Sequence, residues 1–208
     1  MGSILATTLS PYVAPANGHL FHSSNGDTTS CIYNPMMLGT SGTVVATGGS
    51  GSLASGYTLY SQGSSNNFTL SKVARTDGVQ GEWQQIVMNS GNVDGFKLQQ
   101  NFFSGSWTAG DTIRVSVEFQ TSNDWVSQSD FRLVVTSTGL QLAYFTSAPL
   151  PAGQPPSSGV MSVVGVVPAS APNVQIQVLF KASQGTIRIG RIGAQNLTAQ
   201  SLTAYAGL

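Results

Sequence analysis

Charged side chains are scarce in this sequence. Eight Lys and Arg residues balance eight Asp and Glu residues, and together they make up 8% of the 208 residues, where an ordinary soluble domain has about a quarter. A chain with so little positive charge is a poor partner for phosphate groups, so we expect no nucleic-acid binding. Neutral polar side chains and 24 glycines replace the missing ions. Because a net charge near zero favours association, we expect the chain to pack against copies of itself or a larger assembly.

Cysteine and histidine are nearly absent as well. Cys31 is the single cysteine, so an internal disulfide cannot hold the fold together. His19 and His22 are the only histidines, and Asp27 is the one carboxylate near them, which is too little for a catalytic triad or a zinc site. No G-x-S-x-G, H-E-x-x-H or phosphate-loop motif occurs. We therefore expect a protein without catalytic activity, metal or cofactor.

Pairs of carboxylates are the remaining route to an enzyme. Asp124 and Asp130 flank Trp125 in one expected loop, and Glu82 and Asp94 border neighbouring expected strands. Two facing acids in a cleft could hydrolyse a glycosidic bond. Solvated loop carboxylates explain both pairs more simply, so we prefer that interpretation to a glycan-processing enzyme.

Long apolar runs are also missing. No run is long enough to span a bilayer, and the first eleven residues lack the basic start and apolar centre of a signal peptide. The sequence therefore predicts neither membrane insertion nor secretion.

Strict alternation of apolar and polar side chains is the strongest signal that is present. It runs through 112–119 and 174–180 and is typical of half-buried β-strands. Further strands are expected at 57–61, 67–74, 82–89, 95–103, 111–120, 130–136, 139–145, 160–167, 173–181 and 185–192. Regular short strands predict an all-β fold, a two-sheet antiparallel jelly-roll β-sandwich. Its expected core is Val73, Trp83, Ile86, Phe96, Leu98, Ile113, Val115, Val117, Phe119, Leu133, Val135, Leu142, Val163, Ile176, Val178, Ile187 and Ile189.

Composition divides the chain into three expected parts: an extended arm (1–33), the sandwich (34–198) and a tail (199–208). Prolines and Asn-Gly pairs interrupt the arm, and 39–56 reads as a Gly/Ser/Thr-rich connection that could lie on a sheet if paired. An extended arm can add to the sheet edge of a neighbour. Its apolar side chains would do so: Ile4, Leu5, Leu9, Tyr12, Val13, Leu20 and Phe21.

Three tryptophans give the only functional hint among single residues. Trp83 and Trp107 stand in strand-like contexts, where core packing is expected. Trp125 lies in a polar loop at 121–128 and could be a sugar-stacking platform, or it could fold back over the end of the sandwich. The candidate carbohydrate-binding residues are Asn123, Asp124, Trp125, Arg132 and Tyr144.

Four phrases together carry a family resemblance: NPMM at 34–37, KVARTDG at 72–78 with GEWQQ at 81–85, AGDT at 109–112 and RIGRIGAQNL at 188–197. They resemble the C-terminal jelly-roll domains of bacteriophage tail fibres and tailspikes, which are similar to carbohydrate-binding modules and recur as trimeric capsid-decoration or head-fibre proteins. The resemblance covers about residues 34–198.

The resemblance implies a non-enzymatic virion structural protein of the capsid-decoration (cement) or head-fibre type. It also implies a homotrimer, with the major capsid protein or another virion protein as partner. Such a protein would be made in the host cytoplasm and placed on the virion surface. The alternative is a tail-fibre or tailspike receptor-binding module that recognises a bacterial surface polysaccharide.

Overall fold

The computed structural model describes residues 37, 39, 43–47, 50–54, 56–63, 66–79, 81–90, 95–101, 108–127, 131–137, 143–147, 158–169 and 174–198. The predicted arm with its seven apolar residues, the predicted tail, Cys31, both histidines, Asp94, Trp107, Asp130 and Leu142 lie outside these residues. The boundaries at 33 and 198 stay predictions.

Thirteen β-strands make up the secondary-structure elements of the described part of the chain. They are β1 (Thr43–Thr47), β2 (Ser50–Gly51), β3 (Thr58–Ser61), β4 (Asn67–Ala74), β5 (Glu82–Ser90), β6 (Phe96–Asn101), β7 (Thr112–Thr121), β8 (Val126–Ser127), β9 (Arg132–Ser137), β10 (Ala143–Thr146), β11 (Ser158–Val166), β12 (Val174–Phe180) and β13 (Ala182–Asn196). No described helix is long and apolar enough to cross a bilayer.

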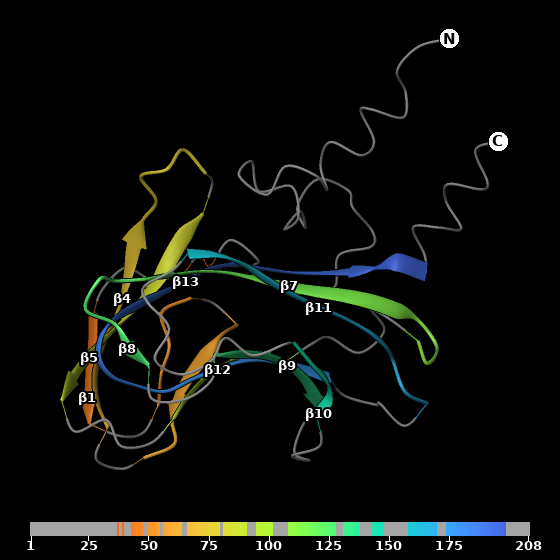
Figure 1. Cartoon of the computed structure of the whole chain (residues 1–208), viewed down its shortest axis with the longest axis horizontal. Helices are drawn as coiled ribbons and strands as arrows, with labels where there is room; N and C mark the ends of the chain where they lie inside the picture. Colours follow the sequence, from red (N-terminus) through yellow and green to blue (C-terminus); the bar gives the residue numbers. More distant parts are fainter. Residues whose placement is uncertain are drawn as a thin grey trace, which may run out of the picture.

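The strands form two antiparallel sheets that lie face to face (Figure 1). The seven-stranded sheet has the order β1-β4-β5-β13-β7-β11, with β8 paired to the start of β13. The six-stranded sheet has the order β10-β9-β12-β6-β3-β2. This confirms the predicted two-sheet β-sandwich.

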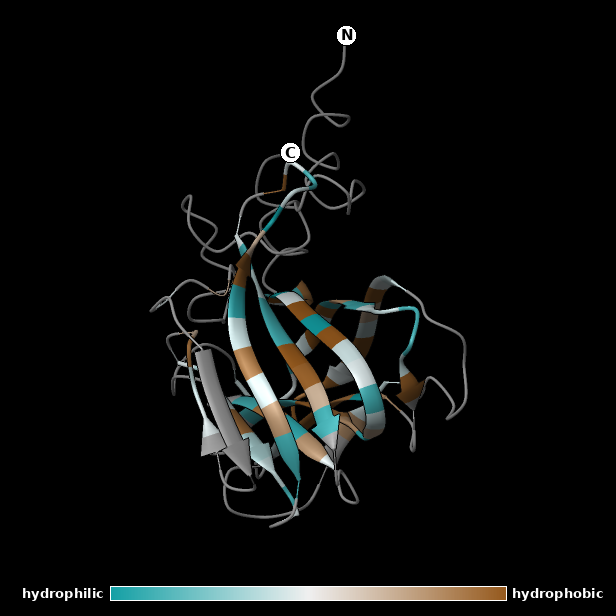
Figure 2. Cartoon of the chain, turned by 90° about the vertical axis from the view of Figure 1, so that its left-hand side faces the viewer, coloured by the Kyte–Doolittle hydropathy of each residue, from teal (hydrophilic) through white to brown (hydrophobic). Residues whose placement is uncertain are grey.

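The core lies between the sheets, and strands such as β7 contribute alternate residues to it, an alternation visible along neighbouring strands in Figure 2. Phe96 is at its centre: its ring packs edge-on against Phe68 at 5.4 Å and stacks with Phe180 at 5.5 Å. The strands with the clearest alternation bury the predicted residues, among them Ile86, Leu98, Ile113, Val115, Val117, Leu133, Val135, Ile176, Val178, Ile187 and Ile189.

Two residues predicted for this core, Val73 and Trp83, lie on the opposite face of the seven-stranded sheet. They are cross-strand partners in the β4–β5 pair, three positions from the pair formed by Leu70 and Ile86. Because side chains alternate between faces, an odd spacing places the two pairs on opposite faces. Trp83 is nevertheless only 8% exposed, because the guanidinium of Arg75 lies over its ring at 4.0 Å. Burial of this tryptophan is therefore due to a side chain on the outside of the sandwich.

Strand β13 is the central element of the larger sheet, since it pairs with β5 on one side and β7 on the other. A β-bulge interrupts the pairing with β7 between Ile189 and Ile192, so that Gly190 and Arg191 together face one residue, Glu118. A bulge of this kind re-aims side chains and often occurs beside functional sites.

Candidate binding face of the seven-stranded sheet

The outer face of the seven-stranded sheet, opposite the core, carries a row of polar side chains that we call the polar row: Gln85, Arg188 and Gln120. Arg188 on β13 is the register partner of Gln85 on β5 and of Gln120 on β7. Its Nε donates to Oε1 of Gln85 at 2.8 Å, and its Nη1 donates to Oε1 of Gln120 at 3.1 Å. Gln85 in turn donates from Nε2 to Oγ of Ser71 at 3.5 Å. The guanidinium is thus held flat across three strands by neutral partners.

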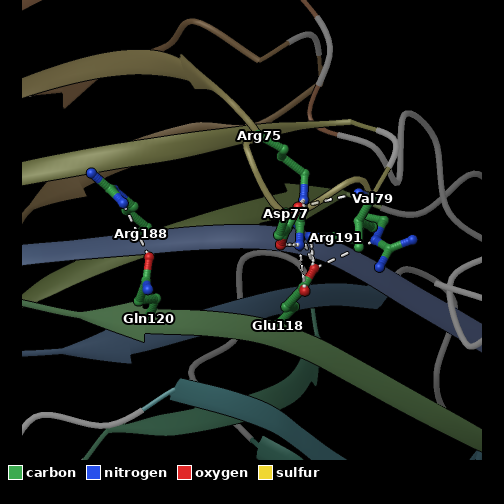
Figure 3. A network of polar contacts seen from close by, with 7 residues as sticks. All are labelled: Arg75, Asp77, Val79, Glu118, Gln120, Arg188 and Arg191. Carbon is green, nitrogen blue, oxygen red and sulfur yellow. Dashed lines mark hydrogen bonds and ion pairs between the residues drawn. The ribbon is translucent and has the colours of Figure 1, made fainter. Parts of the chain in front are cut away.

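Next to the polar row is an ionic cluster of Arg75, Asp77, Glu118 and Arg191 (Figure 3). Arg75 forms a bidentate pair with Glu118, at 2.7 Å from Nη1 to Oε2 and 2.8 Å from Nη2 to Oε1. It also donates to both carboxylate oxygens of Asp77, at 3.0 and 2.5 Å. Arg191 reaches Oε2 of Glu118 from both its backbone N and its Nε, each at 3.4 Å. Glu118 therefore sits between two guanidinium groups.

Gly190 makes room for this cluster. A Cβ atom at this position would lie 2.5 Å from the Trp83 ring, 2.8 Å from Oε2 of Glu118 and 3.0 Å from Nη1 of Arg75. The absence of a side chain at the bulge lets the indole, the carboxylate and the guanidinium converge over β13.

The ion pairs fix the charge states of the cluster. The pKa of Asp77 is lowered, chiefly by its side-chain hydrogen bond with Arg75, while burial acts against the shift. Burial disfavours the charged form of Arg75, but its hydrogen bonds to Glu118 and Asp77 outweigh that effect and raise its pKa. Burial lowers the pKa of Arg191, partly offset by the charge of Glu118, and an arginine still keeps its proton.

Two grooves open on this face. The arginine groove, of about 300 Å³, is lined by Gln85, Gln120, Thr121, Ser122, Asn123, Thr186 and Arg188. The tryptophan groove, of about 400 Å³, is lined by Asp77, Trp83, Glu118, Phe119, Gln120, Ser158, Gly159 and Val160. Gln120 contributes to both, so the two grooves adjoin along the sheet.

The loop predicted to hold a sugar platform borders the arginine groove, but Trp125 points inward. The indole is 9% exposed and its ring centre lies 6.3 Å from that of Phe180, which matches the packing alternative, not a stacking platform. The loop docks on β13: the backbone N of Thr186 donates to Oγ of Ser122 at 2.8 Å, and that of Ser122 to the Thr186 carbonyl at 2.9 Å. Gly185, at φ 91°, lets the Trp125 backbone approach, since a Cβ there would lie 2.5 Å from its Cα.

The other predicted site residues do not gather in one place. Asn123 lines the arginine groove, and Asp124 is exposed beside it, accepting a hydrogen bond from Ser122 Oγ. Arg132 is exposed on β9, in the other sheet, and Tyr144 belongs to β10 of that sheet with its side chain outside the described part. Their role in carbohydrate binding stays a prediction.

The sequence does contain a pattern that could have indicated the polar row and the ionic cluster. Glu118 and Gln120 occupy outward positions of β7, where the alternation is clear, and Arg188 occupies an outward position of the neighbouring β13. Because few residues of this chain are charged, charged side chains at outward positions of adjacent strands indicate a candidate site. Among the described residues no group of three or more His, Cys, Asp or Glu side chains could hold a metal ion.

The sequence matches no protein-family model, and it matches no curated protein. Solved structures do match the fold. An arabinose-bound α-L-arabinofuranosidase aligns over 83% of this chain and 27% of its own, with 11% identity and a TM-score of 0.55. The Stig cyclase Fisc from Fischerella sp. TAU aligns over 81% of this chain and 98% of its own, with 9% identity and a TM-score of 0.51.

A third match is the enzymatically active domain of bacteriophage CBA120 tailspike protein 4. It covers 69% of this chain and 20% of its own, with 14% identity and a TM-score of 0.48. Carbohydrate-binding modules are also among the matches, at TM-scores of 0.43, 0.41 and 0.42. The chain spans about a fifth of the tailspike chain and about a quarter of the arabinofuranosidase chain. At these identities the likeness concerns the fold, a β-sandwich shared by proteins of several kinds.

Proposed function

We propose that this chain is a non-enzymatic carbohydrate-binding β-sandwich displayed on a bacteriophage virion, and that it binds saccharide on the outer face of the seven-stranded sheet. The observation that carries the proposal is the polar row, which lines the arginine groove and reaches the adjoining tryptophan groove through Gln120. Amide and hydroxyl groups from three strands and one loop point into these grooves. Such groups both donate and accept hydrogen bonds, as sugar hydroxyls do, and the strands hold them in fixed positions.

The ionic cluster supports a binding role over glycoside hydrolysis. A glycosidase of the usual kind needs one protonated carboxyl group beside a second carboxylate. The two acids of the cluster, Asp77 and Glu118, are both bound to Arg75. The lowered pKa of Asp77 leaves it ionised near neutral pH and unsuited as the acid.

The proposal is tested by retention of the chain in gels that contain bacterial surface polysaccharides. We expect Gln120→Ala to weaken retention about tenfold, because Gln120 lines both grooves and each lost hydrogen bond costs about 1 kcal/mol. Gln177→Ala is the matched control, since it makes the same change on β12 of the other sheet. Equal retention of both variants would place the site elsewhere, and no retention of the unaltered chain on any polysaccharide would reject the proposal.

Capsid decoration or a head fibre is the second candidate, favoured by edge strand β11. Val160, Val164 and Val166 are 36%, 51% and 58% exposed on its outer side, an apolar stripe that packing between copies would cover. Quantitative mass spectrometry of purified particles would separate the two. We expect a decoration protein at about one copy per capsid subunit, whereas a tail protein would be present in a few copies per particle.

A further inference from the structure

Arg188 differs from the two arginines of the ionic cluster, because no described carboxylate forms an ion pair with it. Arg75 and Arg191 both form ion pairs with Glu118. The described residues provide no ion pair to Arg188, whose side chain donates instead to the neutral amides of Gln85 and Gln120. A positive charge is therefore held, half-buried, in a fixed place without a countercharge.

The unused hydrogen-bonding capacity of Arg188 faces a ligand-sized space. A guanidinium has five N–H donors, and two of them serve the polar row. The other three have no partner among the described residues. Gln85 is itself oriented by its bond to Ser71, so its oxygen is turned towards Arg188.

The charge of the arginine groove is positive. Arg188 is the single charged residue among the seven that line it. The nearest acid of the adjoining loop, Asp124, is exposed and belongs to the rim, where it accepts from Ser122. The tryptophan groove differs, because its carboxylates are compensated by Arg75.

We propose that the arginine groove recognises an acidic saccharide, with a sugar carboxylate bound by Arg188. This inference rests on the proposed function and names the ligand class of that site. A planar guanidinium matches a carboxylate in a two-bond arrangement, and such charge-assisted bonds are about twice as strong as neutral ones. Gln120 and Asn123, which also line the groove, can bind the hydroxyl groups of the same sugar or its neighbour.

The experiment compares acidic polysaccharides with their carboxyl-reduced forms, in which each carboxylate has become a primary alcohol. The probes are a panel of uronate-containing bacterial capsular polysaccharides, and the readout is the dissociation constant from affinity electrophoresis of the full chain. We expect reduction of the carboxylates to weaken binding about tenfold or more. Binding of the acidic form should also weaken as ionic strength rises from about 0.05 M to about 0.5 M.

Three variants assign the effect to Arg188. Arg188→Gln should lose the preference for the acidic form, so that the dissociation constants of the acidic and reduced forms become about equal. Arg114→Gln is the control, because it removes the same charge from the same face of the sheet. Arg114 lies six residues before Gln120 on β7, about 20 Å away, and this variant should bind like the unaltered chain. Gln120→Glu places a carboxylate beside Arg188 and should block the acidic form, which keeps the test valid if Arg188→Gln fails to fold.

Each of the following results would overturn one or both proposals. Equal binding of acidic and reduced forms overturns the acidic-ligand proposal and leaves carbohydrate binding standing. A preference for the acidic form that survives both Arg188→Gln and Gln120→Glu also overturns it. Retention on phosphate-substituted polymers alone contradicts the assignment of a carboxylate, and a chain that binds no polysaccharide of either form overturns both proposals.

Discussion

Replacing Glu118 by Gln is expected to lower the free energy of unfolding by about 3–5 kcal/mol, because it removes the carboxylate that two buried guanidinium groups share. The side chains of Arg75 and Arg191 are 2% and 4% exposed, and both bind this carboxylate. After the substitution the one remaining acid at Arg75 is Asp77, whose side chain is 46% exposed. Chemical denaturation with guanidinium chloride, with the midpoint and slope compared, measures the loss.

The matched control is Asp77→Asn, which makes the same chemical change at the exposed end of the same cluster. We expect a loss of less than about 1 kcal/mol, as for surface ion pairs. If Glu118→Gln cost no more than Asp77→Asn, the two buried arginines would not depend on Glu118 for their stability.

Replacing Phe96 by Ala is expected to cost about 3–5 kcal/mol, the range for removing a fully buried aromatic ring. Phe96 is 0% exposed and contacts Phe68 from the opposite sheet and Phe180 from its own. The expected result is a fall in thermal and denaturant midpoints.

Phe96→Leu should cost clearly less than Phe96→Ala, since it refills most of the cavity. Carbohydrate retention, measured where Phe96→Ala is still folded, should be unchanged because the ring lies on the core side. Equal losses for the two substitutions would mean that neighbouring side chains collapse into the space.

Much of the fold could be predicted because most strands alternate regularly. The expected strand at 67–74 has the observed bounds of β4, and β7 and β12 lie within two residues of theirs. The strands that were not predicted lack this signal: β1 lies in a Gly/Ser/Thr-rich segment and is a strand because β4 pairs with it. Strand β8 has two residues within a polar loop and exists through its pairing with β13.

The faces of the tryptophans could not be predicted from one sequence. Trp83 is apolar yet outward, because Arg75, which lies beyond the end of β4, folds back to cover it. Trp125 sits among polar residues yet turns inward, because hydrogen bonds between its loop and Thr186 fix the backbone that carries it. The hydrogen bond that fixes the Trp125 loop joins residues 64 apart in sequence, and the ion pair of Arg75 with Glu118 joins residues 43 apart.

The central place of β13 has a consequence for how the chain is made on the ribosome. The β4–β5 and β7–β11 pairs can each form once their own residues have emerged, and among the described strands β13 is the one that pairs with both. Residues 182–196 must therefore leave the exit tunnel before the pieces can join into one sheet. Until then each piece has an open edge beside its apolar side, where a nascent neighbour could pair. We expect the insertion of this strand to be the slow step of folding, because its pairing with β5 and β7 closes long loops.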